Sequence, residues 1–274
     1  MENFPARAPR LIASDIDGTL LDRNHRVPRR NRDAVARAVQ QGAYFALSTG
    51  RPFRWIAPVL EQLPARPVCV TSNGAVLYDS AEDRVMSAHE LSPAALAEVV
   101  DVAQTVLGTV GFGAERAGGS LADAVEDLFV VERHYSENAL FEGFGVVSMG
   151  ELVGQPAVKF LIRNTDYSAP ELYELIAPHI DPELAHLTYS MQEGILEVAA
   201  PDVTKRRGVE WLAQHTGVAQ QETIAFGDMP NDIEMLRWAG CGVAMENAHP
   251  EVKAAADAVT VANHQAGVAK VLER

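Results

Sequence analysis

Residues 11–22 have the sequence LIASDIDGTLLD, in which a short apolar run ends in two carboxylates two positions apart. In an extended backbone, residues i and i+2 point to the same face, so Asp15 and Asp17 share a side at the end of a predicted strand. Gly18 then permits a sharp turn out of the strand. Open parallel sheets bind ligands at the carboxyl ends of their strands, so this position favours a binding or catalytic site.

Apolar runs separated by amphipathic segments continue on both sides of a different middle region. Residues 10–85 show this alternation, which is typical of strand-helix-strand units and a parallel sheet. Pro28 opens one amphipathic segment and Gly42 ends it, so a helix is expected between them. The C-terminal part repeats the pattern. The predicted strands are 11–14, 43–48, 68–71, 223–226, 242–245 and 258–261, and the predicted C-terminal helices cover about 207–215 and 232–238.

The middle of the chain, from about residue 86 to 199, has a different character. It carries glycine-rich patches and isolated apolar runs such as 157–162. We interpret it as a second domain inserted into the first. The predicted fold class is therefore α/β, with a Rossmann-like parallel-sheet core formed by residues 1–86 and 200–274 and an inserted α+β domain at 87–199.

The composition is that of a folded, acidic protein. Of 274 residues, 47% are hydrophobic and 22% are charged, and the formal net charge is −14. Such a surface repels nucleic acid and anionic membranes, so we expect neither as a partner. No stretch approaches the about 18 apolar residues of a membrane span, and no secretory signal is visible, so a cytoplasmic protein is expected. Cys69 and Cys241 lack metal-ligand spacing and are expected to be buried thiols.

The pair Asp15 and Asp17 suits phosphate ester chemistry. A carboxylate is ionised at neutral pH, since its reference pKa is about 3.9, and it can attack phosphorus to form an aspartyl phosphate. Asp15 fits this nucleophilic role. Asp17 can then protonate the leaving alcohol and later deprotonate the attacking water. An Asp-Gly pair is also common in plain turns, which is the alternative interpretation of residues 17–18.

A second polar segment, AFGDMPND at residues 225–232, again follows an apolar run and opens a helix. Asp228 can bind a hard cation there. Alternatively, Asn231 or Asp232 simply caps the following helix.

Two further segments offer groups that bind phosphate. In ALSTGR, residues 46–51, Ser48 or Thr49 can donate to a phosphate oxygen or cap a helix. Lys205 stands near the start of a predicted helix, where the helix dipole disfavours a cation. A role at the site explains this placement, and surface solubility is the alternative.

The four aspartates of these segments total four negative charges, so a dianionic phosphate cannot join them unaided. If Asp17 is protonated as the general acid, three charges remain, and one Mg²⁺ together with Lys205 neutralises them. Mg²⁺ takes oxygen ligands and keeps several waters, so Asp15, Asp228 and one backbone carbonyl are a sufficient protein contribution. This interpretation therefore requires Mg²⁺ as a cofactor.

In this order, the four segments resemble those of the haloacid dehalogenase-like superfamily of phosphohydrolases, and particularly its Cof-type branch with a large cap domain. The resemblance covers most of the core. It implies Asp15 as the nucleophile, and Asp17 as the acid/base that also binds the metal through its backbone carbonyl. It implies Asp228 as the second carboxylate ligand of Mg²⁺. The other implied residues are Thr49, Lys205 and Asn231 for phosphate binding, with Asp232, Gly50 and Asn73 in supporting positions.

The resemblance also concerns the inserted domain and three other positions. In this branch the cap lies between the second and third motifs, as residues 87–199 do, and its closure excludes water while its side chains select the leaving group. The family lysine is usually followed by glycine, whereas two arginines precede Gly208 here. Asn247 and Asn263 lie in segments with weaker similarity to the family.

The expected function is Mg²⁺-dependent hydrolysis of a small phosphate monoester through an aspartyl phosphate. The expected partner is a small phosphorylated metabolite, either a sugar phosphate or a phosphorylated cofactor such as pyridoxal phosphate. Two alternatives remain open. A phosphosugar mutase returns the phosphoryl group to the sugar, and a non-catalytic phosphometabolite-binding protein releases no phosphate at all.

Overall fold

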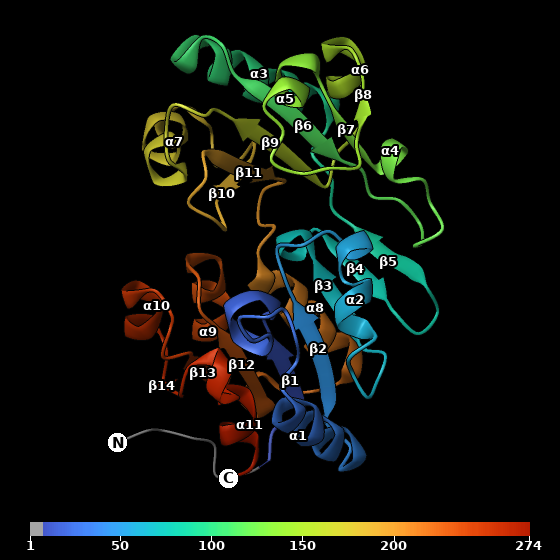
Figure 1. The fold of residues 1–274 in the computed structure, drawn as a ribbon, viewed down its shortest axis with the longest axis vertical. Coiled ribbons are helices and arrows are strands. Elements are labelled where there is room, and N and C mark those ends of the chain that lie inside the picture. Colours follow the sequence, from blue (N-terminus) through green and yellow to red (C-terminus); the bar gives the residue numbers. More distant parts are fainter. Residues whose placement is uncertain (1–7) are drawn as a thin grey trace. The chain divides into compact units, whose positions relative to one another are not determined.

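The computed structural model describes residues 8–274, which form two compact units (Figure 1). One unit contains the described residues up to Met86 together with Thr204–Arg274, and the other is Ser87–Val203. The second boundary differs from the expected return to the core at residue 200. Residues 200–203 belong to the second unit, where the Val203 N–H donates to the carbonyl of Ala200 and closes a turn.

The first unit is built on an eight-stranded sheet. Its strands are β1 (Leu11–Ser14), β2 (Tyr44–Ser48), β3 (Val68–Thr71), β4 (Val76–Asp79), β5 (Arg84–Ala88), β12 (Thr223–Gly227), β13 (Cys241–Ala244) and β14 (Ala258–Val259). They are arranged in the order β14-β13-β12-β1-β2-β3-β4-β5. β1 is fully buried at the centre and pairs in parallel with β12 and β2. The predicted continuation of one sheet by the C-terminal strands is therefore confirmed.

Helices lie on both faces of this sheet (Figure 1). They are α1 (Arg29–Gln40), α2 (Ala57–Leu60), α8 (Lys205–Thr216), α9 (Ile233–Trp238), α10 (Pro250–Ala255) and α11 (Gly267–Leu272). Strand residues such as Leu11 and Ala13 form one apolar cluster with Val209 of α8 and Leu236 of α9. This burial is the main favourable contribution that holds the helices on the sheet.

The edge of the sheet departs from the purely parallel prediction. β3 pairs antiparallel with β4, with Val68 opposite Asp79. Only a short turn at Ser72–Gly74 separates these two strands. A parallel pair requires a crossover of a dozen or more residues, so a connection this short produces a hairpin.

The second unit has a six-stranded sheet of its own. Its strands are β6 (Gly111–Glu115), β7 (Phe129–Val131), β8 (Gly145–Val146), β9 (Lys159–Arg163), β10 (His186–Thr188) and β11 (Ile195–Ala199), and its helices are α3 (Pro93–Leu107), α4 (Val125–Leu128), α5 (Arg133–Glu137), α6 (Met149–Val153) and α7 (Ala169–Ile176). The order is β10-β11-β9-β6-β7-β8, and only β7 and β8 are paired in parallel. Residues of α3 and α7 pack on one apolar cluster with Phe112 and Phe160. The predicted α+β character of the insertion is thus confirmed.

Two other expectations concern the chain as a whole. Among residues 8–274, no helix combines the length and apolar character that crossing a membrane requires. Cys69 and Cys241 are both buried, as predicted, and burial raises the pKa of each thiol, that of Cys241 to about 11.

Candidate active site

Asp15 stands directly after β1, and its side chain contacts a lysine that lies 190 positions later in the chain. Its backbone N–H donates to the carbonyl of Phe226 on β12, 3.0 Å away, which fixes it at the carboxyl end of the sheet. Lys205 Nζ lies 2.7 Å from Asp15 Oδ1 and 2.7 Å from Asp232 Oδ1. Lys205 is only 1% exposed, so its ammonium is satisfied by carboxylates rather than by bulk water.

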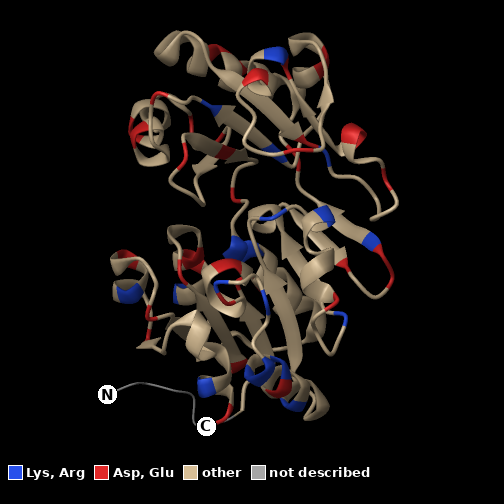
Figure 2. Ribbon diagram, in the orientation of Figure 1, with Lys and Arg blue, Asp and Glu red and all other residues tan. Residues whose placement is uncertain are grey.

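Lys205 reaches this position because α8 begins at it, two residues earlier than the sequence pattern predicted. The Thr204 hydroxyl caps the helix by accepting from the Arg207 N–H at 3.3 Å. Figure 2 shows basic residues at this beginning of α8. Burial favours the neutral amine, but Asp15 and Asp232 outweigh it and raise the pKa of Lys205. The lysine therefore stays charged, and the surface interpretation of this residue is wrong.

Asp228 and Asp232 come from the loop that follows β12. The Thr19 hydroxyl donates to Asp228 Oδ1 at 2.8 Å. Asp232 Oδ2 accepts from the backbone N–H groups of Asp228 and Met229 at 2.9 and 3.0 Å. Asp232 thus accepts from the backbone at the start of the short helix Pro230–Asp232 and also holds the lysine, whereas its side chain makes no capping bond to α9, the helix that the sequence predicted Asn231 or Asp232 to cap.

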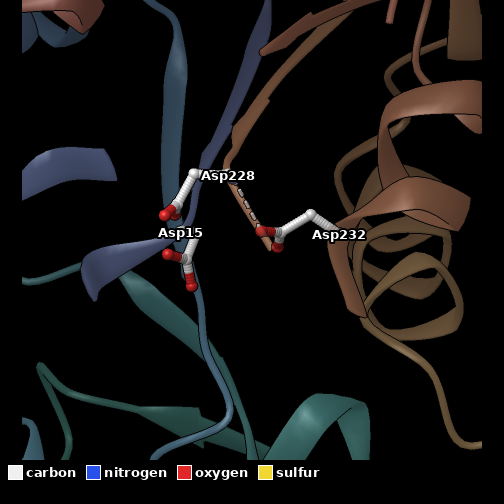
Figure 3. A group of neighbouring side chains, drawn as sticks. All are labelled: Asp15, Asp228 and Asp232. Atoms are coloured by element: carbon white, nitrogen blue, oxygen red, sulfur yellow. Dashed lines mark hydrogen bonds between the residues drawn. The ribbon is translucent and has the colours of Figure 1, made fainter. Parts of the chain in front are cut away.

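Figure 3 shows the carboxylates of Asp15 and Asp228 side by side, with the carboxylate of Asp232 pointing toward them. One oxygen from each of the three lies within 4.8 Å of the others, and all three residues are buried. Burial, together with the neighbouring carboxylates, raises the pKa of Asp15, and it raises that of Asp228 to about 7. When all three carboxylates are ionised, they exceed the one ammonium by two negative charges. The donor set therefore fits a divalent cation with oxygen ligands.

The turn after β1 brings Gly18 into close contact with the Asp228 side chain. Residues Ile16–Leu20 form a wide turn closed by the Leu21 N–H, which donates to the carbonyl of Ile16 at 3.0 Å. Gly18 has φ of +74°, and a Cβ at this position would lie 2.1 Å from Asp228 Oδ2. Only glycine allows both this backbone conformation and this close approach. The Asp-Gly pair is therefore more than a plain surface turn.

Asp17 is paired with an arginine that the sequence did not single out. Arg51 Nε donates to Asp17 Oδ2 at 2.7 Å, and Nη2 donates to Oδ1 at 2.5 Å. The Asp17 side chain is 49% exposed, whereas Asp15 is buried. Arg51 directly follows Thr49 and Gly50 at a strand end, and this position could have marked it as a site residue. Its partner, Asp17, could not be inferred from spacing along the sequence.

The end of β2 brings hydroxyl groups to the same edge of the sheet. Thr49 Oγ1 accepts from the Arg51 N–H at 3.1 Å. Ser48 Oγ is buried and makes no hydrogen bond to any of residues 8–274. The Thr49 hydroxyl thus accepts one bond and keeps its own hydrogen to donate, whereas the Ser48 hydroxyl is enclosed by the protein.

The remaining expected residues form a chain of amides. Asn231 Nδ2 donates to Asn73 Oδ1 at 2.9 Å, which joins the loop after β12 to the loop after β3. A Cβ on Gly50 would lie 3.1 Å from the same Asn73 oxygen. Asn231 Oδ1 is buried and bonds to none of the described residues, so this oxygen is free to accept from a ligand. The hydrogen bonds of the structure thus join Asp15, Asp228, Asp232 and Lys205, and separately Asn73 and Asn231.

Comparison with known proteins gives four findings. Residues 12–272 match the family model of the haloacid dehalogenase-like hydrolases. The chain is 28% identical over 273 residues to a 5-amino-6-(5-phospho-D-ribitylamino)uracil phosphatase of Bacillus subtilis, covering 97% of both chains. It is also 28% identical to a second phosphatase of Bacillus subtilis, covering 96% of this chain and 99% of the other. A solved haloacid dehalogenase-like hydrolase from Bacteroides thetaiotaomicron superimposes with a TM-score of 0.74 at 25% identity, covering 97% of this chain and 99% of that one.

Proposed function

This chain belongs to the haloacid dehalogenase-like hydrolases, in the Cof-type branch, and we propose that it is a Mg²⁺-dependent phosphatase that transfers the phosphoryl group of a small monoester to Asp15. The observation that carries the proposal is the buried bridge from Lys205 to Asp15 and Asp232, 2.7 Å on each side, next to Asp228. The Lys205 ammonium favours the ionised form of Asp15, which supports a nucleophilic role, and a divalent cation bound by the neighbouring carboxylates would offset their negative charge for an incoming phosphate.

The reaction has two balanced halves. In the first, an Asp15 oxygen forms a bond to phosphorus, the ester P–O bond breaks, and Asp17 gives its proton to the leaving alkoxide. In the second, water attacks the same phosphorus, Asp17 takes its proton, and the bond from Asp15 to phosphorus breaks to release inorganic phosphate. Because Arg51 occupies both Asp17 oxygens, that ion pair has to open before Asp17 can act.

The proposed Mg²⁺ ligands are Asp15, Asp228 and the backbone carbonyl of Asp17. When bound, Mg²⁺ polarises the phosphoryl group and neutralises the carboxylates. Lys205 would contact a phosphoryl oxygen while it holds Asp15 in place. The other proposed phosphate ligands are Thr49 and Asn231, with Gly50, Asn73 and Asp232 in supporting positions.

We propose a sugar phosphate or another phosphorylated small molecule as the substrate. The support is the relative named for 5-amino-6-(5-phospho-D-ribitylamino)uracil, in which the phosphate ester is carried by a ribityl chain. The net charge of −14 disfavours nucleic acid as the substrate, because a polyanion would be repelled.

The test is release of free phosphate from a panel of phosphorylated sugars, nucleotides and cofactors with Mg²⁺. We expect the Asp15→Asn variant to lose at least about 10³-fold in kcat, because the amide is not a competent nucleophile. Asp33→Asn, which changes an exposed aspartate of α1, is the control and should keep wild-type turnover.

Other outcomes distinguish the alternatives. Full turnover by Asp15→Asn would contradict the covalent mechanism. Transfer of the phosphoryl group to a second sugar hydroxyl without free phosphate would indicate a mutase. A wild-type protein that binds phosphorylated compounds and releases no phosphate from the panel would support the non-catalytic alternative.

A further inference from the structure

The loop after β13 is hydrogen-bonded to the end of β12, next to Asp228. The Met245 N–H donates to the carbonyl of Gly227 at 3.1 Å, and the His249 N–H donates to the carbonyl of Asp228 at 2.9 Å. The loop is thus fixed to the end of β12. Between these two anchors stands Asn247, which is exposed on the surface.

Asn247 uses both ends of its amide in spite of this exposure. Its Nδ2 donates to the carbonyl of Gly18 at 2.8 Å, and its Oδ1 accepts from the Asn263 N–H at 2.9 Å. Asn263 Nδ2 in turn donates to the carbonyl of Leu21 at 2.8 Å. Two carbonyls of the turn that follows Asp15 are therefore held by side-chain amides from the C-terminal part of the chain.

The turn needs such external support because its own backbone is irregular. Asp17 and Gly18 both depart from helical dihedral angles, so the carbonyl of Gly18 is not aligned along a regular helix. The same turn carries the Asp17 side chain and the Thr19 hydroxyl, which donates to Asp228. A hydrogen bond to the carbonyl of Gly18 therefore restrains the backbone that orients the side chains of Asp17 and Thr19.

We propose that Asn247 is a positioning residue that holds the turn Ile16–Leu21, and through it Asp17, in the arrangement that acid and base catalysis require. The proposal rests on the proposed phosphatase function. Asn247 acts through the Gly18 carbonyl, and its donor end is the part that matters. The competing explanation is that Asn247 merely ties its own loop to Asn263 through its acceptor end.

Two substitutions separate these explanations. Asn247→Asp keeps the shape and the acceptor oxygens for the Asn263 N–H, but it cannot donate to the carbonyl of Gly18. Asn247→Ala removes both bonds and adds no charge. Because Asn247 is exposed, both variants should fold, and Gln265→Ala in the neighbouring loop is the matched control with an exposed side chain.

The first measurement is hydrogen exchange of a peptide that covers residues 15–22, in the absence of substrate. We expect both Asn247 variants to exchange faster than wild type in this peptide, and Gln265→Ala to match wild type. Unchanged exchange in Asn247→Asp would overturn the proposal. This readout does not depend on the enzyme being active, so it judges the turn independently of the phosphatase proposal.

The second measurement is turnover with two kinds of leaving group, p-nitrophenyl phosphate and the best alkyl phosphate of the panel. Both variants should lose about 10-fold in kcat on the alkyl phosphate with little change in KM, because misplacing Asp17 affects the chemical steps. With p-nitrophenyl phosphate the leaving group needs little protonation, so phosphorylation should stay fast while turnover of the aspartyl phosphate slows and a burst of p-nitrophenol appears.

The outcomes are distinct for the two proposals. An active Asn247→Asp variant with wild-type kcat on both substrates would overturn the positioning role and leave the phosphatase function intact. A slow Asn247→Ala beside a normal Asn247→Asp would likewise overturn it in favour of the loop tie. A wild-type enzyme that releases no phosphate would contradict the phosphatase function, and the catalytic positioning role with it.

Discussion

Each unit of the protein buries a lysine against a carboxylate, and the two pairs have almost the same geometry. Lys205 Nζ lies 2.7 Å from Asp15 Oδ1 in the first unit, and Lys159 Nζ lies 2.8 Å from Glu197 Oε2 in the second. Both lysines are less than a tenth exposed. Burial and distance alone therefore do not tell a reactive site from a structural ion pair.

The two pairs differ in what fixes them. Lys159 stands on β9 and Glu197 on the neighbouring β11, and Glu197 also accepts from the Ser190 hydroxyl at 2.6 Å. Strand pairing brings these side chains together inside a sheet. Lys205 instead opens a helix and meets residues that follow two strands, with a third carboxylate, Asp228, beside them. The charges at the strand ends have an excess of one sign, which suits a ligand, whereas the pair in the second unit lies within a sheet where strand pairing sets its partners.

The largest effect should come from Lys205→Met, which leaves three buried carboxylates with no ammonium. We expect kcat for phosphate release to fall at least about 10³-fold. The free energy of unfolding should fall by about 3–5 kcal/mol, the usual cost of removing one partner of a buried pair. Tryptophan fluorescence during urea unfolding measures this, since Trp55, Trp211 and Trp238 all lie in the first unit. Unchanged activity and stability would contradict the view that the Lys205 pair belongs to a reactive site and the Lys159 pair is structural.

A smaller effect is expected from Lys159→Met in the second unit. It leaves Glu197 without its ammonium and should cost about 3 kcal/mol of stability. The double variant Lys159→Met with Glu197→Met should recover most of that loss, because apolar residues often replace a complete buried pair without net cost. Circular dichroism during urea unfolding reports on this unit, which has no tryptophan. A double variant less stable than the single one would show that this pair, too, serves more than its own sheet.

The smallest effect on stability should come from Gly18→Ala, with Gly42→Ala as its matched control. Both glycines have positive φ, at +74° and +94°, so both variants bear backbone strain of about 1–3 kcal/mol. A new Cβ at residue 42 would meet no atom within 4 Å, whereas one at residue 18 would clash with the Asp228 carboxylate. Only Gly18→Ala should therefore lower kcat, by about 10-fold or more, in a phosphate-release assay. Equal activity of the two variants would mean that this close approach does not shape the site.

The sequence predicted the strand-end part of the site well because its signals are local. An apolar run that stops at a carboxylate marks a strand end, and the ends of neighbouring parallel strands meet at one edge of the sheet. Asp15 and Asp228 could be placed together on this basis alone, and the structure has them side by side. The hairpin of β3 and β4 was missed because its strands are as apolar as parallel ones, and only the length of the connection distinguishes them.

Other features depend on contacts that no local pattern contains. Arg51 reaches Asp17 from 34 residues away, and Asn247 reaches Gly18 from 229 residues away. Lys159 stands in a stretch predicted as an apolar strand, so the neighbouring sequence did not indicate that its charge is buried against a carboxylate. Such partners are chosen by the register of the folded chain, which spacing along the sequence does not determine.

The bond between Lys205 and Asp15 also has a consequence for how the protein is made. The two residues are 190 positions apart, so at about 5–20 residues per second the ribosome needs about 10 to 40 seconds after Asp15 before it has synthesised Lys205. During this interval β1 can pair with β2, but its other edge stays open until β12 has been made. An unpaired edge in a partly made chain is a route to aggregation. A strand at the centre of the finished sheet is thus an edge strand in the nascent chain, and it becomes covered only when the C-terminal segment that completes the site has been made.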